Sequence, residues 1–372
     1  MKKIIGIVLA LVMAFATVLT GCAKSTSTDS KGGDKKIKVG FIYVGPVGDG
    51  GFTYSHDEGR KYLEKELKVE TKYKESVKED AAEVEKVCED FINEGCTVII
   101  GTSFGFMDGM EKSAKNHPEV KYLHCSGYKK AENMSNYFGR IYQARYLSGI
   151  VAGLKTKTNK IGYVAAFEIP EVVRGINAFT LGVRSVNPNA TISVSWTHTW
   201  YDPAKESEAA KYLLNDKGVD IIAQHQDTAG PQQAAEAKGA FSIGYNSDMS
   251  KSAPKANLTS AVWNWGPFYV EQIKAIQAGT WKSGSIWEGM SADKEKSIVN
   301  LAELTPNAPA NAKDVVEKAK ADIISGKNKI FVGPLKDNTG AVKVQAGKEM
   351  TDAEMLSFDW FVEGVDGKIE KK

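Results

Sequence analysis

Hydrophobic positions follow two different spacings along the chain after residue 36. Short apolar runs, such as IKVGFIYV at 37–44, alternate with longer segments in which apolar residues recur every three or four positions, as at Val84, Val87 and Phe91. The first spacing is typical of buried strands and the second of helices with one buried face. Alternating strands and helices predict an α/β protein with parallel sheets covered on both faces.

This alternation runs through the chain twice and so predicts two similarly built lobes. In the first run, strands are expected at 37–44, 69–75, 97–102 and 120–127, with helices at 59–67, 80–95 and 106–117. In the second run, strands are expected at 160–167, 190–197, 219–224 and up to 246, with helices at 140–156, 170–186 and 204–217. A helix at 269–278 follows, then a tail with a helix at 312–324, a hairpin at 329–344 and a strand at 359–363. The tail has no core pattern of its own, so a third domain is not expected.

The first 21 residues have the parts of an export signal: Lys2 and Lys3, an apolar run at 4–19, then small residues. A membrane-spanning helix is the alternative, but the run is short and ends in Gly-Cys instead of a charged stop. The ending Leu-Thr-Gly-Cys resembles a bacterial lipobox, which implies cleavage before Cys22 and a lipid on its sulfur. Residues 22–36 are rich in Ser, Thr, Gly and Lys and predict a flexible tether to the membrane.

Charge and cysteine content exclude several classes of function. The chain has 48 basic and 46 acidic residues, and the leader holds two of the lysines, so the exported part carries no net charge. A nucleic-acid partner is therefore not expected. If Cys22 carries the lipid, three cysteines remain: Cys88, Cys96 and Cys125. An odd number argues against a disulfide framework, and their spacing fits neither a metal site nor a redox pair. We therefore interpret them as small core residues.

The loops that follow the predicted strands hold the candidate chemistry. Parallel strands place these loops on one edge of each sheet, where open α/β sheets bind ligands. They combine aromatic rings with amides, hydroxyls and carboxylates, as a small-molecule cleft requires. The loops are 45–54, 103–106 and 126–128 in the first lobe, and 167–169, 198–201, 224–227 and 245–248 in the second.

Catalytic motifs are missing from the sequence. It contains no GxSxG, GxxxxGK[ST], HExxH or EF-hand pattern, and its five histidines lack metal-ligand spacing, so we expect no cofactor and no metal. Three carboxylates in these loops could serve as general bases: Asp49, Asp227 and Asp248. A simpler role for them is to accept a hydrogen bond from an N–H group of a ligand.

Several segments together resemble the BMP (basic membrane protein) family of substrate-binding lipoproteins, which includes PnrA-like purine-nucleoside receptors. They include KVGFIYVGPVGDGGFTYSHDEG, PEVVRGINAFTLGVRSVNP, DIIAQHQD, GYNSDMS and LTSAVWNWGPF. The resemblance implies a type I periplasmic-binding-protein fold, in which two Rossmann-like lobes joined by a three-crossover hinge close on a ligand for an ABC importer. It places the first lobe at 37–139 plus 262–285, and the second at 140–261 plus 286–372.

The resemblance also suggests site residues. The family's first-loop aspartate and aromatic fall on Asp49 and Phe52, and its second-lobe aspartate on Asp248. The residues expected to contact the ligand are Asp49, Phe52, Tyr54, Ser103, Phe104, Trp200, Gln224, Asp227, Asn246, Asp248, Trp263 and Asn264.

One departure from the family pattern bears on the ligand. In nucleoside receptors a lysine that holds the sugar follows a Thr-Ser pair, whereas here Ala261, Val262 and Trp263 follow Thr259-Ser260. An extra ring in place of a sugar clamp fits a free purine base, with adenine as the first candidate, although Trp263 and Trp265 could instead pack the hinge. The alternatives are a purine-nucleoside receptor, a surface nucleoside hydrolase, and a ligand-gated sensor without transport.

Overall fold

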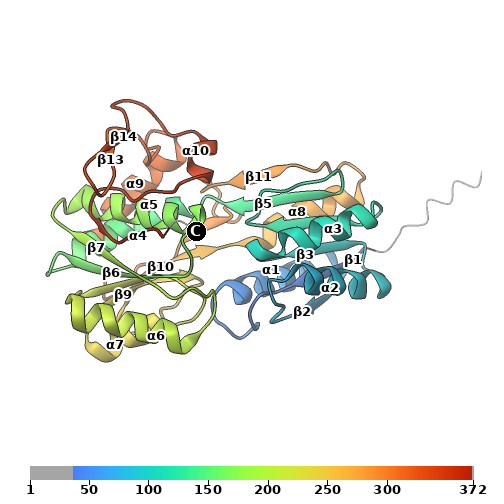
Figure 1. Cartoon of the computed structure of the whole chain (residues 1–372), viewed down its shortest axis with the longest axis horizontal. Helices are drawn as coiled ribbons and strands as arrows, with labels where there is room; N and C mark the ends of the chain where they lie inside the picture. Colours follow the sequence, from blue (N-terminus) through green and yellow to red (C-terminus); the bar gives the residue numbers. More distant parts are fainter. Residues whose placement is uncertain (1–36, 371–372) are drawn as a thin grey trace, which may run out of the picture. The chain divides into compact units, whose positions relative to one another are not determined.

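The computed structural model describes residues 37–370, which build two sheets with flanking helices (Figure 1). The expected leader, the tether and Cys22 lie outside the described residues. Every strand pair of the first sheet is parallel, in the order β11-β5-β4-β3-β1-β2. Its strands are β1 (Lys38–Ile42), β2 (Glu70–Lys74), β3 (Val98–Gly101), β4 (Lys121–Cys125), β5 (Met134–Gly139) and β11 (Ser285–Glu288).

Four α-helices belong to the first sheet: α1 (Phe52–Leu67), α2 (Ala81–Asn93), α3 (Met107–Asn116) and α8 (Trp265–Gln277). A short 3-10 turn, η1 (Phe104–Phe106), precedes α3. Helix α1 packs beside α8, and α2 packs beside α3. The apolar stripe read from the sequence explains α2, because Val84, Val87 and Phe91 are all buried.

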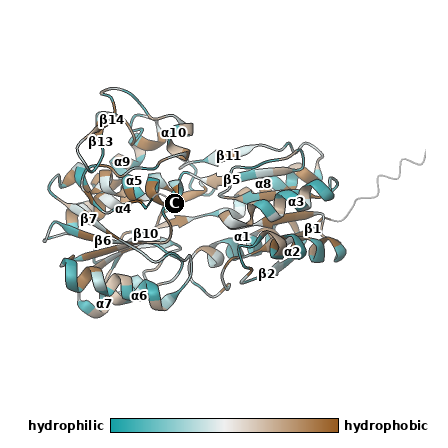
Figure 2. Ribbon diagram, in the orientation of Figure 1, coloured by the Kyte–Doolittle hydropathy of each residue, from teal (hydrophilic) through white to brown (hydrophobic). Residues whose placement is uncertain are grey.

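The second sheet has the order β12-β10-β9-β8-β6-β7-β15 and is parallel except for β12, which runs antiparallel to β10. Its strands are β6 (Lys160–Ala165), β7 (Thr191–Trp196), β8 (Ile221–His225), β9 (Phe241–Asn246), β10 (Asn257–Trp263), β12 (Val299–Leu301) and β15 (Val365–Asp366). Figure 2 shows inner strands such as β1, β6 and β10 coloured as hydrophobic, as expected where a sheet is covered on both faces, whereas the edge strand β2 is polar and largely exposed.

Helices and a small hairpin complete the second lobe. The helices are α4 (Tyr142–Lys155), α5 (Pro170–Val186), α6 (Pro203–Tyr212), α7 (Gly230–Lys238), α9 (Ala312–Ile324) and α10 (Asp352–Leu356). A π-helical turn, η2 (Leu213–Lys217), extends α6, and β13 (Leu335–Lys336) pairs with β14 (Val342–Val344) as an antiparallel hairpin. None of the helices within residues 37–370 has the length and apolar character needed to cross a membrane.

The chain passes between the two sheets three times. It leaves the first sheet after β5, returns from β10 into α8, and leaves again between β11 and β12. Two Rossmann-like lobes with a three-crossover hinge are therefore confirmed as the fold class. The residue boundaries given above for the lobes stay a prediction.

Several elements differ from the sequence-based expectation. Helix α1 begins at Phe52, seven residues before the expected start at Gly59, because the Asp49 side chain caps it. The sequence pattern did not indicate β5, β10, β11, β12 or α10, and the closing strand lies at Val365–Asp366 instead of 359–363. Cys88, Cys96 and Cys125 are buried and free, which confirms their interpretation as core residues.

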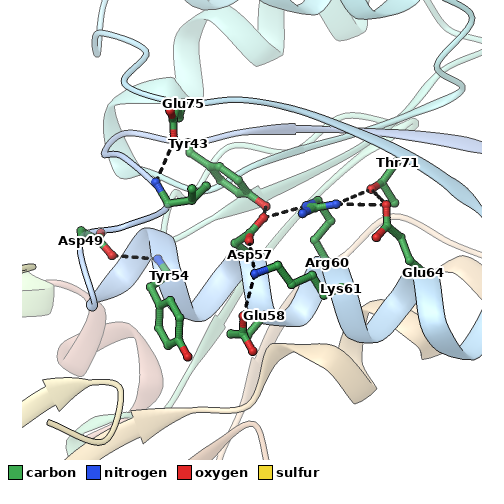
Figure 3. A network of polar contacts seen from close by, with 11 residues as sticks. Tyr43, Asp49, Tyr54, Asp57, Glu58, Arg60, Lys61, Glu64, Thr71 and Glu75 are labelled. Atoms are coloured by element: carbon green, nitrogen blue, oxygen red, sulfur yellow. Dashed lines mark hydrogen bonds and ion pairs between the residues drawn. The ribbon is translucent and has the colours of Figure 1, made fainter. Parts of the chain in front are cut away.

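A polar network fixes α1 against the first sheet (Figure 3). The Asp57 carboxylate accepts hydrogen bonds from Arg60 Nε at 2.7 Å and from the Tyr43 hydroxyl at 3.3 Å. Arg60 also donates to Glu64 and to Thr71, each at 3.0 Å. These contacts hold the pKa of Asp57 below its usual value, chiefly through the Arg60 hydrogen bond acting against burial. The loop that precedes α1 therefore ends at a helix whose position on the sheet is fixed.

Candidate functional site

A narrow pocket, partly open to solvent, lies where the strand ends of the two lobes meet, and the centre of a water-sized sphere can move within about 20 Å³ of it. This position is where open α/β sheets bind ligands. Residues of both lobes line it: Val44, Phe52, Ser103, Phe104 and Ser126 from the first, and Glu171, Trp200, His225, Asp227 and Tyr245 from the second. All but Val44 and Glu171 fall in loops that the sequence analysis selected.

Aromatic rings form much of the pocket wall. Phe52 is the first residue of α1, and its ring lies edge-on to His56 with centroids 4.4 Å apart. Trp200 follows β7 and is held edge-on by Phe167 at 5.0 Å. Tyr245 lies at the end of β9, 4.6 Å from the His225 ring. Each of these rings thus packs against a neighbouring ring, which restricts its movement.

Asp49 shapes the glycine-rich loop instead of facing the pocket. Its carboxylate accepts hydrogen bonds from the backbone N–H groups of Gly51, Thr53 and Tyr54 at 2.8–2.9 Å, one of which is drawn in Figure 3. These groups are among those that a helix start leaves without partners. Burial raises the pKa of Asp49 to about 6, although the backbone hydrogen bonds oppose the shift. Tyr54 is exposed, outside the pocket lining.

The two lobes touch directly beside the pocket. The Ser247 hydroxyl of the second lobe donates a hydrogen bond to the Gly50 carbonyl of the first. Gly51 approaches Asp227 so closely that a Cβ at residue 51 would lie 1.9 Å from the Asp227 carbonyl oxygen. The structure therefore has its lobes in contact beside the pocket, as in the closed state of a two-lobed protein.

Three polar side chains from the second lobe reach the pocket. Burial raises the pKa of Glu171 to about 7, and Arg174 and Arg145 oppose that shift. Burial lowers the pKa of His225 well below its usual value, so this imidazole is neutral. Burial and then the nearby Asp49 charge raise the pKa of Asp227, whose carboxylate accepts a hydrogen bond from Asn246 Nδ2 at 3.0 Å.

Trp263 and Asn246 stand behind the pocket wall. The Trp263 indole stacks on Trp265 at 4.6 Å and donates a hydrogen bond to Asn246 Oδ1 at 2.9 Å. Its ring also lies 6.2 Å from that of Phe52 and 6.4 Å from that of Tyr245, one lining residue from each lobe. In this structure the indole therefore contacts the two lining rings and packs the hinge.

The other residues proposed from the sequence are placed as follows. Gln224 is buried and donates to the backbone carbonyls of Gln226 and Thr228 at 3.1 and 2.7 Å. Asn264 precedes α8 and donates to the carbonyl of Glu295 at 3.0 Å. Asp248 is exposed, and its carboxylate accepts a hydrogen bond from Ser250 N at 3.0 Å. None of the three is among the pocket-lining residues.

Glu171 is the lining residue that the sequence analysis missed most clearly. It is the second residue of α5, two positions beyond the end of the loop selected at 167–169. An acidic residue in the first turn of a helix has a common structural explanation, since it complements the helix dipole. The signal that could have found it is the short distance from the end of β6, which brings the first turn of α5 to the same sheet edge.

A second, more apolar cavity adjoins the pocket. Phe104, Ser126 and Glu171 line both spaces, and the second continues past Ile169, Ile286, Trp287 and Leu356. It thus lies next to the third crossover and α10. Across residues 37–370, the His, Cys, Asp and Glu side chains form no group of three that could hold a metal ion.

Two lobes that meet over a pocket at their strand ends are typical of extracytoplasmic solute-binding proteins. Within that class, the model of the Bmp family, described as ABC transporter substrate-binding protein PnrA-like, matches residues 36–332. The chain belongs to this family of purine- and nucleoside-binding proteins, which work with a permease and ATPase complex. It is a binding protein and not an enzyme.

Individual relatives differ in the ligand that their names give. The chain is 44% identical over 338 residues to a purine-binding protein of Brucella abortus (strain 2308), covering 90% of this chain and 95% of that one. It is 36% identical over 351 residues to a protein of Haloferax volcanii named for glucose binding, covering 94% and 85%. A solute-binding protein of Aeropyrum pernix K1 has a TM-score of 0.67 at 21% identity, covering 81% and 93%, and supports the fold alone.

Proposed function

We propose that this protein binds a free purine base, with adenine as the first candidate, and delivers it to an ABC importer. The observation that carries the proposal is the lining of the pocket, which combines aromatic side chains from both lobes with the carboxyl groups of Glu171 and Asp227. Stacking suits the faces of a flat heterocycle, and the carboxyl groups suit its N–H donors. The purine-binding relative from Brucella abortus supports the same ligand class.

Closure would couple binding to transport. A ligand that contacts Phe52 and Phe104 on one lobe and Trp200 on the other stabilises the closed state over the open one. Closure brings Gly50 and Ser247 into contact at the rim, so the importer would meet a surface that exists only in the closed protein.

We also propose that the protein is anchored through a lipid on Cys22, with residues 23–36 as the tether. The test is to express the full chain and its Cys22→Ala variant in a bacterium that processes lipoproteins. Intact-mass analysis should show the acyl mass on the wild-type protein alone, and the variant should be found in the soluble fraction. Equal membrane retention of both proteins, without an added mass, would contradict the anchor.

The ligand proposal is tested by titration calorimetry on a chain starting at Lys35, with adenine, hypoxanthine, guanine, the matching nucleosides and glucose. A free base should bind most tightly, and glucose is included because of the Haloferax relative. Exclusive binding of glucose or another sugar would overturn the proposal.

A purine nucleoside is the second candidate, favoured by one observation. The adjoining cavity shares Phe104, Ser126 and Glu171 with the pocket. Although mostly apolar, it is also lined by Asn136 and Arg174, whose side chains could hold the hydroxyls of a sugar attached to the base. Nucleosides binding more tightly than their bases in the same titrations would select this candidate.

A further inference from the structure

The carboxyl group of Glu171 differs in its hydrogen bonding from the buried carboxyl groups of Asp49, Glu206 and Asp227. Asp49 accepts three backbone hydrogen bonds. Glu206 accepts hydrogen bonds from the N–H and hydroxyl of Thr228 and from the Asp202 N–H. Asp227 accepts one from Asn246. Glu171 lines the pocket with these groups nearby, yet within residues 37–370 no N–H or O–H group donates a hydrogen bond to it.

The basic groups around Glu171 offset its negative charge but donate no hydrogen bond to its carboxylate oxygens. The closest is His225, whose Nε2 lies 3.4 Å from Oε1, but this imidazole is neutral and its Nε2 also lies 3.3 Å from the Tyr245 hydroxyl. Arg145 donates to the Gln224 carbonyl at 2.6 Å and lies over the Tyr245 ring at 3.5 Å. Arg174 donates to the Met355 carbonyl at 2.7 Å.

The Glu171 side chain is 14% exposed, so water can still reach it in this structure. A ligand that fills the pocket displaces that water, and an acceptor then left without a partner costs about 1–3 kcal/mol, which a ligand N–H avoids. The same cost falls on any ligand that places an alkylated nitrogen or a ring acceptor against these oxygens. Discrimination of this kind exceeds what shape alone gives, because a polar site rejects analogues that leave its groups unpaired.

We propose that Glu171 is the specificity-determining residue of the pocket, and that its carboxylate accepts a hydrogen bond from a ring N–H of the bound heterocycle. This inference rests on the proposed binding of a free purine base. A free base carries a ring N–H that its N-alkylated derivatives lack, so Glu171 selects unsubstituted bases at that nitrogen. The flanking rings of Phe104 and Trp200 limit the ligand to a flat molecule.

The test combines Glu171→Gln with a series of purines methylated at each ring nitrogen in turn, measured by calorimetry at pH 8. We expect Glu171→Gln to weaken binding of the unmethylated base at least tenfold. Methylation of the donating nitrogen should weaken wild-type binding to a similar degree but change binding to the variant little. Two changes that remove the same interaction are non-additive in such a cycle.

Glu168→Gln is the matched control, because Glu168 belongs to the loop before α5 and pairs with His198 outside the pocket lining. It should bind as the wild type does. Glu171→Asp withdraws the carboxylate by one methylene and should give an intermediate affinity, which keeps the test available if the Gln variant does not fold. Melting temperatures without ligand report on folding.

The outcomes separate the two proposals. Wild-type protein that binds no purine overturns the proposed function, and the role of Glu171 with it. Purine binding that is equally tight in the wild type and in Glu171→Gln overturns the role of Glu171 alone, as does a methylation penalty of the same size in both proteins.

Discussion

Gly51 of the first lobe lies against the backbone carbonyl of Asp227 in the second, with room for no side chain between them. A Cβ at residue 51 would lie 1.9 Å from the carbonyl oxygen, so Gly51→Ala should hold the lobes apart. We expect affinity for the ligand to fall at least tenfold while the ligand-free protein keeps its secondary structure. Small-angle scattering with saturating ligand should show compaction of the wild type and less compaction of the variant.

Gly48 provides the control for this experiment. It belongs to the same loop, and a Cβ there would meet no atom within 4 Å. Gly48→Ala should therefore close and bind as the wild type does. Equal binding by Gly51→Ala and the wild type would show that the contact between the lobes is dispensable.

Trp200 should contribute binding energy through stacking. Its ring lines the pocket and is braced by Phe167. Removing a base-stacking ring costs about 1–3 kcal/mol, roughly 5- to 150-fold in Kd. Trp200→Ala should show a loss in this range by calorimetry, whereas Tyr201→Ala, next in sequence but outside the lining, should not. The same loss in both variants would point to a disturbed loop.

The two carboxylates proposed from the second lobe can be compared directly. Asp227 is buried and lines the pocket, whereas Asp248 is exposed and accepts a hydrogen bond from Ser250 N. We expect Asp227→Ala to weaken ligand binding tenfold or more, and Asp248→Ala to change it less than twofold. Loss of binding in Asp248→Ala alone would restore the assignment that the family resemblance suggested.

Glu206 should make the stability of the ligand-free protein depend on pH. Burial raises its folded-state pKa to about 7, above the unfolded value, so its contribution is present in full below the unfolded pKa and is lost as pH rises through about 7. At about 1.4 kcal/mol per pKa unit, the loss is of the order of a few kcal/mol. Urea unfolding should show the wild type losing stability between pH 5 and pH 8.

Glu206→Gln should flatten this pH dependence, and Glu208→Gln, exposed on the same helix, should leave it unchanged. Glu171 and Asp49 also have raised pKa values, so part of the dependence should remain in Glu206→Gln. An identical profile for the wild type and Glu206→Gln would contradict the assignment.

The fold followed from periodicity because each lobe repeats one strand and helix unit. Helix α9 has the bounds that its apolar spacing predicted, and α5 likewise begins at its proline. The missed elements are those that periodicity does not describe. Strand β5 is buried along its whole length despite its Ser and Asn residues, and β11 is a four-residue edge strand whose partner lies far away in sequence.

The sequence predicted which loops line the candidate site, but not which side chains in them face the pocket. Aromatic residues after strands, such as Phe104 and Trp200, could be selected because rings are uncommon in turns. The role of Asp49 could not be read, because a carboxylate that caps a helix and one that binds a ligand have the same sequence signature. Trp263 shows the same limit, since only its contacts with Asn246 and Trp265 reveal that it lies behind the wall.

The pairing of β11 with β5 has a consequence for the order of folding during export. The first sheet is one strand short until residue 288 has crossed the membrane, and β5 has an unpaired edge until then. The intervening residues include most of the second sheet and all of α8. The two lobes therefore complete folding together late in translocation, and neither can be produced alone by cutting the chain once. Contacts so distant in sequence slow folding, and the β5 edge stays open to other strands until β11 arrives.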